Sequence, residues 1–176
     1  MKMPSTPFET VILTTAFYGV LLISLLMLSV LYQWVMVDSL RVRLGEMANQ
    51  VASEVTGLYA MCQKPRNNVD LFKPISLPAS ISEQGYAIEF KQIRGVWHVV
   101  AYLESNRAIN ASSPLWSEPG SEVFVETGAG SFQVGSYTVN YTGVLHSGRR
   151  NAVVWARRID GSITVGVGWV EKNGGG

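Results

Sequence analysis

The sequence predicts an α+β protein, in which a long N-terminal transmembrane helix continues as an amphipathic helix and precedes a small antiparallel β-sandwich. Three observations lead to this fold class. Residues 11–37 form an apolar run without a charge. Apolar residues then recur at helical spacing as far as residue 58, and from residue 86 onward they alternate with polar ones, as in half-buried strands. The 176 residues suffice for one domain and a tail.

Charge is distributed unevenly along the chain. Charged residues make up 15% of the sequence, against roughly 25% in an average soluble protein. Residues 1–37 carry only Lys2 and Glu9, so the remainder has an ordinary globular composition. A net charge of +1 without a basic cluster argues against nucleic acid as a partner. The single cysteine, Cys62, excludes an intrachain disulfide.

The apolar segment, residues 11–37, is longer than the roughly 20 helical residues that cross a bilayer core. Aromatic residues near both ends fit interfacial belts: Phe17, Tyr18, Tyr32 and Trp34. A buried core helix is disfavoured, because a domain of this size rarely hides so long a helix that is apolar on every side. A cleaved secretory signal would have a shorter core of about 7–15 residues. We therefore expect a transmembrane helix, whose nearly balanced flanking charges do not decide its orientation.

The predicted helix continues past the apolar segment, because no proline follows until Pro65. After a short polar N-terminus at 1–10, we expect one long helix over 11–63, transmembrane at 11–37 and amphipathic at 38–63. Its apolar positions form one stripe: Leu40, Leu44, Met47, Val51, Val55 and Leu58. The stripe either packs on the chain's own sheet or bundles with other copies. The spacing leaves both open, although amphipathic helices mostly face their own core.

The second half of the sequence has the pattern of a β-domain, expected at 85–173. Residues 64–84 contain three prolines and are expected to be a linker. Arg94-Gly95 and Asp160-Gly161 are turn signals between alternating runs. Gly166 and Gly168 leave one face of the last strand without bulk, which permits close approach by another segment. The expected strands are a hairpin at 86–103 and further strands at 122–126, 133–145, 151–158 and 162–170.

No arrangement of residues predicts catalysis, so we expect no enzyme activity, no cofactor and no metal. His98 and His146 lack metal-ligand spacing, and no Gly-rich loop opens a helix to cradle phosphate. Two basic pairs, Arg149-Arg150 and Arg157-Arg158, fit either an anionic surface or solvated strand ends.

Two glycosylation sequons suit an exported domain. They begin at Asn110 and Asn140, although about one such sequon is expected by chance. They agree with a protein that is anchored in a membrane with its C-terminal domain outside the cell.

The layout of the chain resembles the type IV pilin superfamily, and archaeal pilin-like proteins in particular. The segments STPFETVILTTAF and LPASISEQGYAIEF carry the resemblance. It implies that a peptidase removes a leader, residues 1–4, by cutting between Pro4 and Ser5, which makes Glu9 the fifth mature residue. Pro4 stands where the family has a small residue. After this cut, the α-amine of a neighbouring copy would pair with Glu9 and fix the axial register. In the alternative, the leader stays on the chain and Glu9 lies at the headgroup level in water.

The resemblance implies a structural subunit of an extracellular filament, with a role in cell adhesion and with other pilin-like subunits as further partners. Self-assembly through the helix would place small residues at close contacts. The residues expected to pack helices together are Glu9, Gly19, Ser24, Leu40, Leu44, Met47 and Val51. The alternative is a membrane-anchored accessory or binding protein of the cell envelope with an exported β-sandwich.

Overall fold

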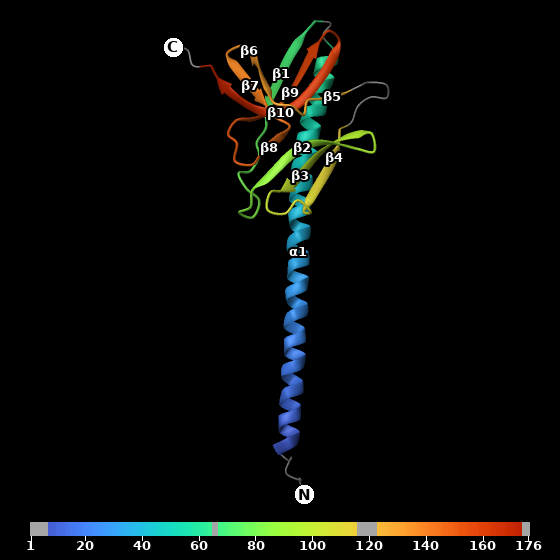
Figure 1. The fold of residues 1–176 in the computed structure, drawn as a ribbon, viewed down its shortest axis with the longest axis vertical. Coiled ribbons are helices and arrows are strands. Elements are labelled where there is room, and N and C mark those ends of the chain that lie inside the picture. The colour runs from blue at the N-terminus through green and yellow to red at the C-terminus, as the bar shows by residue number, and fades with distance from the viewer. Residues whose placement is uncertain (1–6, 65–66, 116–122, 174–176) are drawn as a thin grey trace. The chain divides into compact units, whose positions relative to one another are not determined.

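The computed structural model describes residues 7–64, 67–115 and 123–173, with the backbone alone at 7–9 (Figure 1). One long helix, α1, covers Pro7–Gln63, which agrees with the continuous helix expected from the sequence. The strands that follow are β1 (Val69–Pro74), β2 (Tyr86–Ile93), β3 (Val96–Leu103), β4 (Asn110–Pro114), β5 (Phe124–Val125), β6 (Gly130–Val134), β7 (Tyr137–Tyr141), β8 (Val144–His146), β9 (Ala152–Ile159) and β10 (Ser162–Lys172).

The chain divides into two compact units, Met1–Ser39 and Leu40–Gly176. Helix α1 contributes its first part to one unit and its second part to the other. The second unit therefore contains the amphipathic half of the helix as well as every described strand.

The described strands of the second unit form two sheets (Figure 1). The six-stranded sheet has the order β1-β9-β10-β7-β6, with β5 also paired to β10, and the four-stranded sheet has the order β4-β3-β2-β8. The pairings are antiparallel except for the short parallel pair of β5 and β10. A long helix followed by antiparallel sheets confirms the α+β class. The sandwich arrangement stays a prediction.

Both predicted turns form hairpins. Strands β2 and β3 pair from Tyr86↔Leu103 to Ile93↔Val96, and β9 pairs with β10 across Asp160-Gly161. The two central residues of each turn have positive φ, namely 52° and 82° at Arg94-Gly95 and 50° and 87° at Asp160-Gly161. This geometry matches the right-handed twist of the flanking strands.

Two expectations about the β-domain are wrong. The single strand expected at 133–145 is divided into β6, β7 and β8, because the chain turns at Gly135 with a φ of 57°. It then passes so close to Thr127 that a Cβ on Gly143 would lie 2.2 Å from the Thr127 carbonyl oxygen. The segment 64–84, expected to be a linker, contains β1, which pairs with β9. Strand β1 has no alternation in burial, so the period-two signal is missing there.

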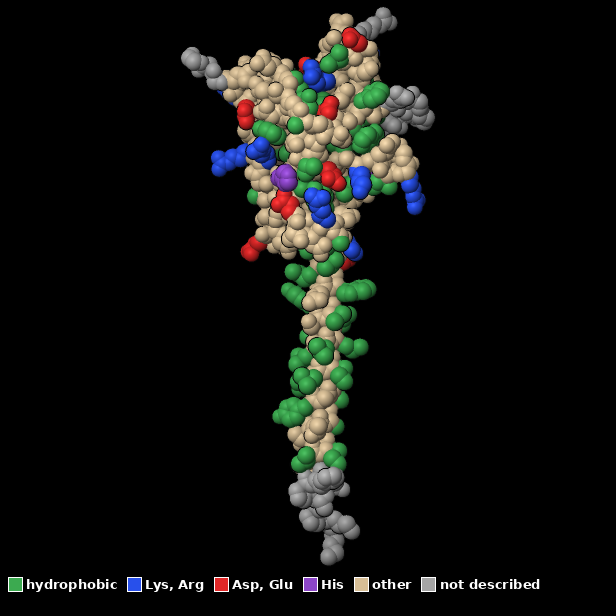
Figure 2. Space-filling view, in the orientation of Figure 1, with side chains coloured by type: hydrophobic (Ala, Val, Ile, Leu, Met, Phe, Trp, Pro, Cys, Tyr) green, Lys and Arg blue, Asp and Glu red, His purple; other side chains and the backbone are tan. Residues whose placement is uncertain are grey.

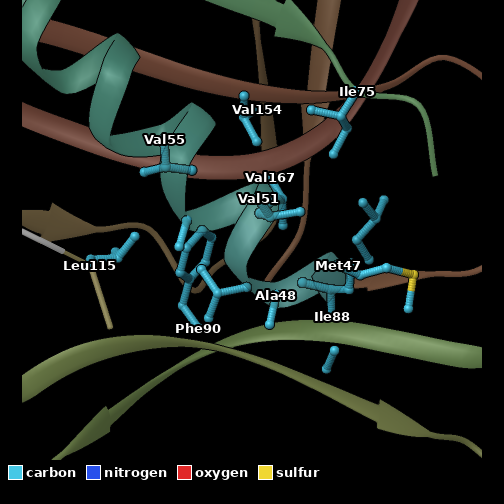
Figure 3. Packing of buried hydrophobic residues seen from close by; sticks show 14 of the residues in the cluster. Met47, Ala48, Val51, Val55, Ile75, Ile88, Phe90, Leu115, Val154 and Val167 are labelled. Atoms are coloured by element: carbon cyan, nitrogen blue, oxygen red, sulfur yellow. The ribbon is translucent and has the colours of Figure 1, made fainter. Parts of the chain in front are cut away.

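The main core joins the helix to both sheets. All six residues of the helical stripe are buried, and each buried aliphatic side chain contributes roughly 1.5–3 kcal/mol. Figure 3 shows Met47 and Ala48 near Ile88 of β2, and Val51 near Val167 of β10. The stripe thus packs against the chain's own sheets.

An aromatic cluster fills the other face of the six-stranded sheet. Trp155 of β9 lies 5.3 Å from Phe132 of β6 and 5.0 Å from Tyr141 of β7, measured between ring centroids. Residues from strands that are not neighbours meet here, because the Trp155 ring lies over Gly166 of the intervening strand β10. A Cβ on Gly166 would lie 2.4 Å from the Trp155 ring. The close approach expected at the glycine face is therefore made by this chain's own tryptophan.

Candidate functional sites

The apolar segment is exposed along the described part of its length. The most apolar 18-residue window of α1 has a mean hydropathy of 2.4, and none of it is buried within the chain. Figure 2 shows hydrophobic side chains projecting to both sides and across the visible face of this stretch of the helix. The helix is long and apolar enough to cross a membrane, and its exposure contradicts the alternative of a buried core helix.

Three hydroxyl groups within the apolar segment find hydrogen-bond partners on the same helix. Thr14, Thr15 and Ser24 each donate a hydrogen bond to the carbonyl oxygen four residues earlier, at 2.7, 2.9 and 2.9 Å. Such internal bonds satisfy polar side chains that would otherwise be expensive in hydrocarbon. The segment can therefore enter an apolar environment without leaving these donors unpaired.

The structure locates only some of the residues expected to act in assembly. Pro4 and Ser5 lie outside the described residues, and so does the side chain of Glu9. Apart from its two chain neighbours and the backbone of its own helical turns, nothing in this chain would lie within 4 Å of a Cβ on Gly19. Four others, which were expected to pack helices together, are buried in the chain's own core: Leu40, Leu44, Met47 and Val51. Their packing is within one copy, which corrects the expectation that they contact other copies.

A basic turn, residues 147–151, connects β8 in one sheet to β9 in the other. The backbone N–H of Ser147 donates to the Tyr86 carbonyl at 2.8 Å, and the Tyr86 N–H donates to the Ser147 hydroxyl at 3.1 Å. At the other end, the Val170 N–H donates to the Asn151 carbonyl at 3.0 Å. Positive φ angles at Gly148 and Asn151 shape the turn. The two arginines between these fixed ends are thus presented from an ordered backbone.

Two hollows flank the basic turn. The first, of about 380 Å³, lies between the turn and residues 75–79, which begin the connection from β1 in the six-stranded sheet to β2 in the four-stranded sheet. The second, of about 440 Å³, lies between the turn and Thr142, Val144 and Trp169. Both volumes fall within the range of small-molecule sites, roughly 300–1,000 Å³. None of the described residues that line either hollow is acidic.

Arg149 contacts an aromatic ring, and two glutamates near the turn are bonded to other side chains. The Arg149 guanidinium carbon lies 3.9 Å from the centroid of the Trp169 ring, and the Trp169 indole N–H donates to the Glu171 carboxylate. His146, which lines both hollows, pairs with Glu104, which is not among the lining residues of either. Among the described residues, neither Arg149 nor Arg150 makes an ion pair.

The second basic pair has structural roles instead. Arg157 donates from Nε to Asp70 at 2.9 Å, and this pair joins β9 to β1. Arg158 donates to the carbonyl oxygens of Cys62 and Gln63 at 3.2 and 2.9 Å. These bonds satisfy two of the carbonyls that the end of α1 leaves without helical partners.

The remaining candidate residues occupy varied positions. Asn110 is exposed at the start of β4, and its side-chain amide donates to the Arg107 carbonyl at 2.8 Å. Asn140 is half-buried in β7. Cys62 is buried, and its burial raises the pKa of the thiol. In the part of the chain that the structure describes, no three His, Cys, Asp or Glu residues are grouped so that they could hold a metal ion.

Tyr86 forms part of the wall of the first hollow. Its side chain is almost fully buried, and its hydroxyl donates to the Pro78 carbonyl at 2.6 Å. Burial raises the pKa of Tyr86 from its ordinary value of 10 to about 12, because the phenolate would lose its hydration.

The raised pKa of Tyr86 predicts a loss of stability at alkaline pH. The unfolded chain releases this proton first, so the stabilisation is complete below about pH 10 and declines as the pH rises towards 12. Urea unfolding at pH 9 and 12 should show a smaller decline for Tyr86→Phe than for the unmodified chain. Tyr137→Phe, on an exposed tyrosine, serves as the control and should keep the original decline. Equal declines in all three proteins would contradict the assignment.

Sequence reasoning drew attention to Arg149 and Arg150 but missed the hollows. The first hollow depends on residues 75–79, which lie more than 65 positions from the basic turn, and no local pattern indicates that the two connections run side by side. The stacking of Arg149 on Trp169 likewise depends on the pairing of β9 with β10.

Comparison with known proteins gave no match to a family model, a curated protein or a solved structure. The fold alone therefore defines the class: an α+β protein with one exposed apolar helix of membrane-spanning length, which continues into a β-rich unit.

Proposed function

We propose that the protein is a structural, pilin-like subunit that assembles through its N-terminal helix into an extracellular filament. The exposed apolar segment carries this proposal, because 27 uncharged residues require either lipid or protein neighbours. In this proposal the segment first anchors the chain in the membrane, with the C-terminal unit outside the cell. It later exchanges lipid for the helices of other copies. No catalytic role is proposed.

The surroundings of Gly19 support the assembly step. Helices pack in apolar environments through small residues, which let their backbones approach closely. Gly19 lies within the apolar segment, and beyond its chain neighbours and the backbone of its own helical turns the chain places nothing within 4 Å of a Cβ there. A single copy therefore tolerates a side chain at this position, whereas a closely packed neighbour would not. Ser24, whose hydroxyl is already satisfied on its own helix, is suited to a similar contact.

We predict that Gly19→Leu lowers filament yield several-fold and leaves membrane insertion unchanged. Leucine is apolar, so it inserts readily, but its bulk would separate neighbouring helices. Filament yield is measured in sheared material, and insertion is measured by extraction of membranes at high pH. Gly19→Ala, which adds one methyl group, is the graded control and should assemble better than Gly19→Leu. Normal yield from Gly19→Leu would count against packing at this position.

The second candidate function is a membrane-anchored accessory or binding protein with an exported β-sandwich. The basic turn favours it, because two hollows and two arginines that form no ion pair with any described residue make a surface suited to a ligand. Detergent-soluble small oligomers, in place of fibres, would support this candidate over the first.

A further inference from the structure

We propose that the first hollow, between the basic turn and residues 75–79, binds a small hydroxylated carboxylate of the uronic-acid class. The proposal extends the second candidate function by naming its ligand, and it does not depend on filament assembly.

The hollow is built before any ligand arrives. Both of its walls are connections between the two sheets, and both are held by backbone hydrogen bonds. The Ile75 N–H donates to the Ala152 carbonyl at 2.9 Å, next to the bonds that fix Ser147 and Asn151. A site of this kind loses little conformational entropy on binding, which favours even a small ligand.

The charge of the hollow selects an anion. Arg149 and Arg150 both line it, and none of its described lining residues is acidic. The carboxylate next to the lining, Glu104, is paired with His146. The Arg149 guanidinium carbon lies over the Trp169 ring, close enough for the group to stack on it. Stacking fixes the plane of the group and leaves the N–H donors at its edge available, in the fork geometry that matches a carboxylate.

The size of the hollow and its uncharged polar groups favour a ligand that also carries hydroxyl groups. A volume of about 380 Å³ exceeds what one inorganic oxyanion would fill. The Ser147 hydroxyl lies in the wall and accepts a hydrogen bond from the Tyr86 N–H, so its own proton remains for a ligand oxygen. Leu77 and Leu145 supply apolar surface beside it. A sugar ring that carries one carboxylate provides both the anion and the hydroxyl groups.

Titration calorimetry on the full chain in uncharged detergent micelles tests this site. Glucuronate should bind with a Kd of about 1 mM, which is a modest affinity for a small ligand. Methyl glucoside has similar hydroxyl groups without the charge and should bind at least about tenfold more weakly, since bonds to charged partners are the strong ones. Inorganic phosphate should also bind more weakly, because it leaves the hollow largely unfilled.

Two matched double variants distinguish binding at the hollow from a general effect of the protein's positive charge. Arg149→Gln with Arg150→Gln should raise the Kd for glucuronate at least about tenfold. Lys91→Gln with Lys172→Gln removes the same charge from exposed residues outside the hollow and should leave the Kd within about twofold, a change worth no more than one weak surface interaction. If the first double variant does not fold, Arg150→Gln alone should still weaken binding, because Arg150 has no stacking role.

Three results would overturn the proposal: no binding of glucuronate, equal binding by both double variants, or binding of phosphate or methyl glucoside as tight as that of glucuronate. None of them bears on fibre formation, which is observed separately. Failure of the ligand site and failure of the filament proposal are therefore distinguishable.

Discussion

Two lysines in the middle of the apolar segment, Leu25→Lys with Leu28→Lys, are expected to release the protein from membranes. Each lysine at the centre of a membrane helix raises the free energy of insertion by about 2.5–3.5 kcal/mol, and the loss of each leucine raises it by a few tenths of a kcal/mol more. The double variant therefore inserts less favourably by about 6–8 kcal/mol. Both leucines are exposed in the folded chain. The unfolding free energy of the unit Leu40–Gly176 should therefore not change, and the double variant should appear folded in the soluble fraction.

A second pair of lysines controls for added charge. Val42 and Met61 are also exposed apolar residues of α1, but both lie beyond residue 37. Val42→Lys with Met61→Lys should remain in the membrane fraction. Fractionation followed by urea unfolding gives both quantities. If the central lysines left the protein in the membrane, the apolar segment would not be a membrane span. If they destabilised the second unit, the two leucines would not be free of contacts with it.

Trp155→Ala is expected to lower the free energy of unfolding by about 3–5 kcal/mol, the usual range for deleting a buried aromatic side chain. Trp155 is 2% exposed and contacts the rings of Phe132 and Tyr141. Its indole N–H also donates to the Val167 carbonyl at 3.4 Å. Since Gly166 has no side chain to move into the space, the cavity should persist.

Urea unfolding followed by circular dichroism measures this effect. Trp34→Ala is the matched control, because Trp34 is 77% exposed and its loss should leave the stability of the second unit unchanged. A change below about 1 kcal/mol for Trp155→Ala would mean that the aromatic cluster adds little to the fold, since surface substitutions typically stay within about 0.5 kcal/mol.

Local patterns predicted the parts of this protein that local physics determines. The uninterrupted apolar and amphipathic periods gave α1 as one helix, and Arg94-Gly95 and Asp160-Gly161 gave two hairpins, because positive φ at both positions is required by tight turns. Strand β1 was missed because its alternation is absent and its partner, β9, lies some 80 residues away. Pairing over that distance leaves no trace in a short window of sequence.

In the candidate sites, too, local sequence predicts some features, and others depend on strands that are distant in the sequence. Exposure of the apolar segment follows from its composition. The packing partner of the amphipathic stripe does not follow from composition or spacing. Leu40 and Leu44 have the spacing of either a filament contact or a core residue, and only the position of the two sheets decides that they are core. Arg149 and Arg157 look alike in sequence. One is stacked beside a hollow and the other is paired with Asp70, because their partners come from different strands.

Electron microscopy of material sheared from cells that express the chain tests the filament proposal most directly. Antibodies against the unit Leu40–Gly176 should decorate regular fibres along their length, and mass spectrometry of those fibres should identify this chain. If the protein is found only in membranes, and detergent extracts it as small oligomers without fibres, the filament proposal is contradicted.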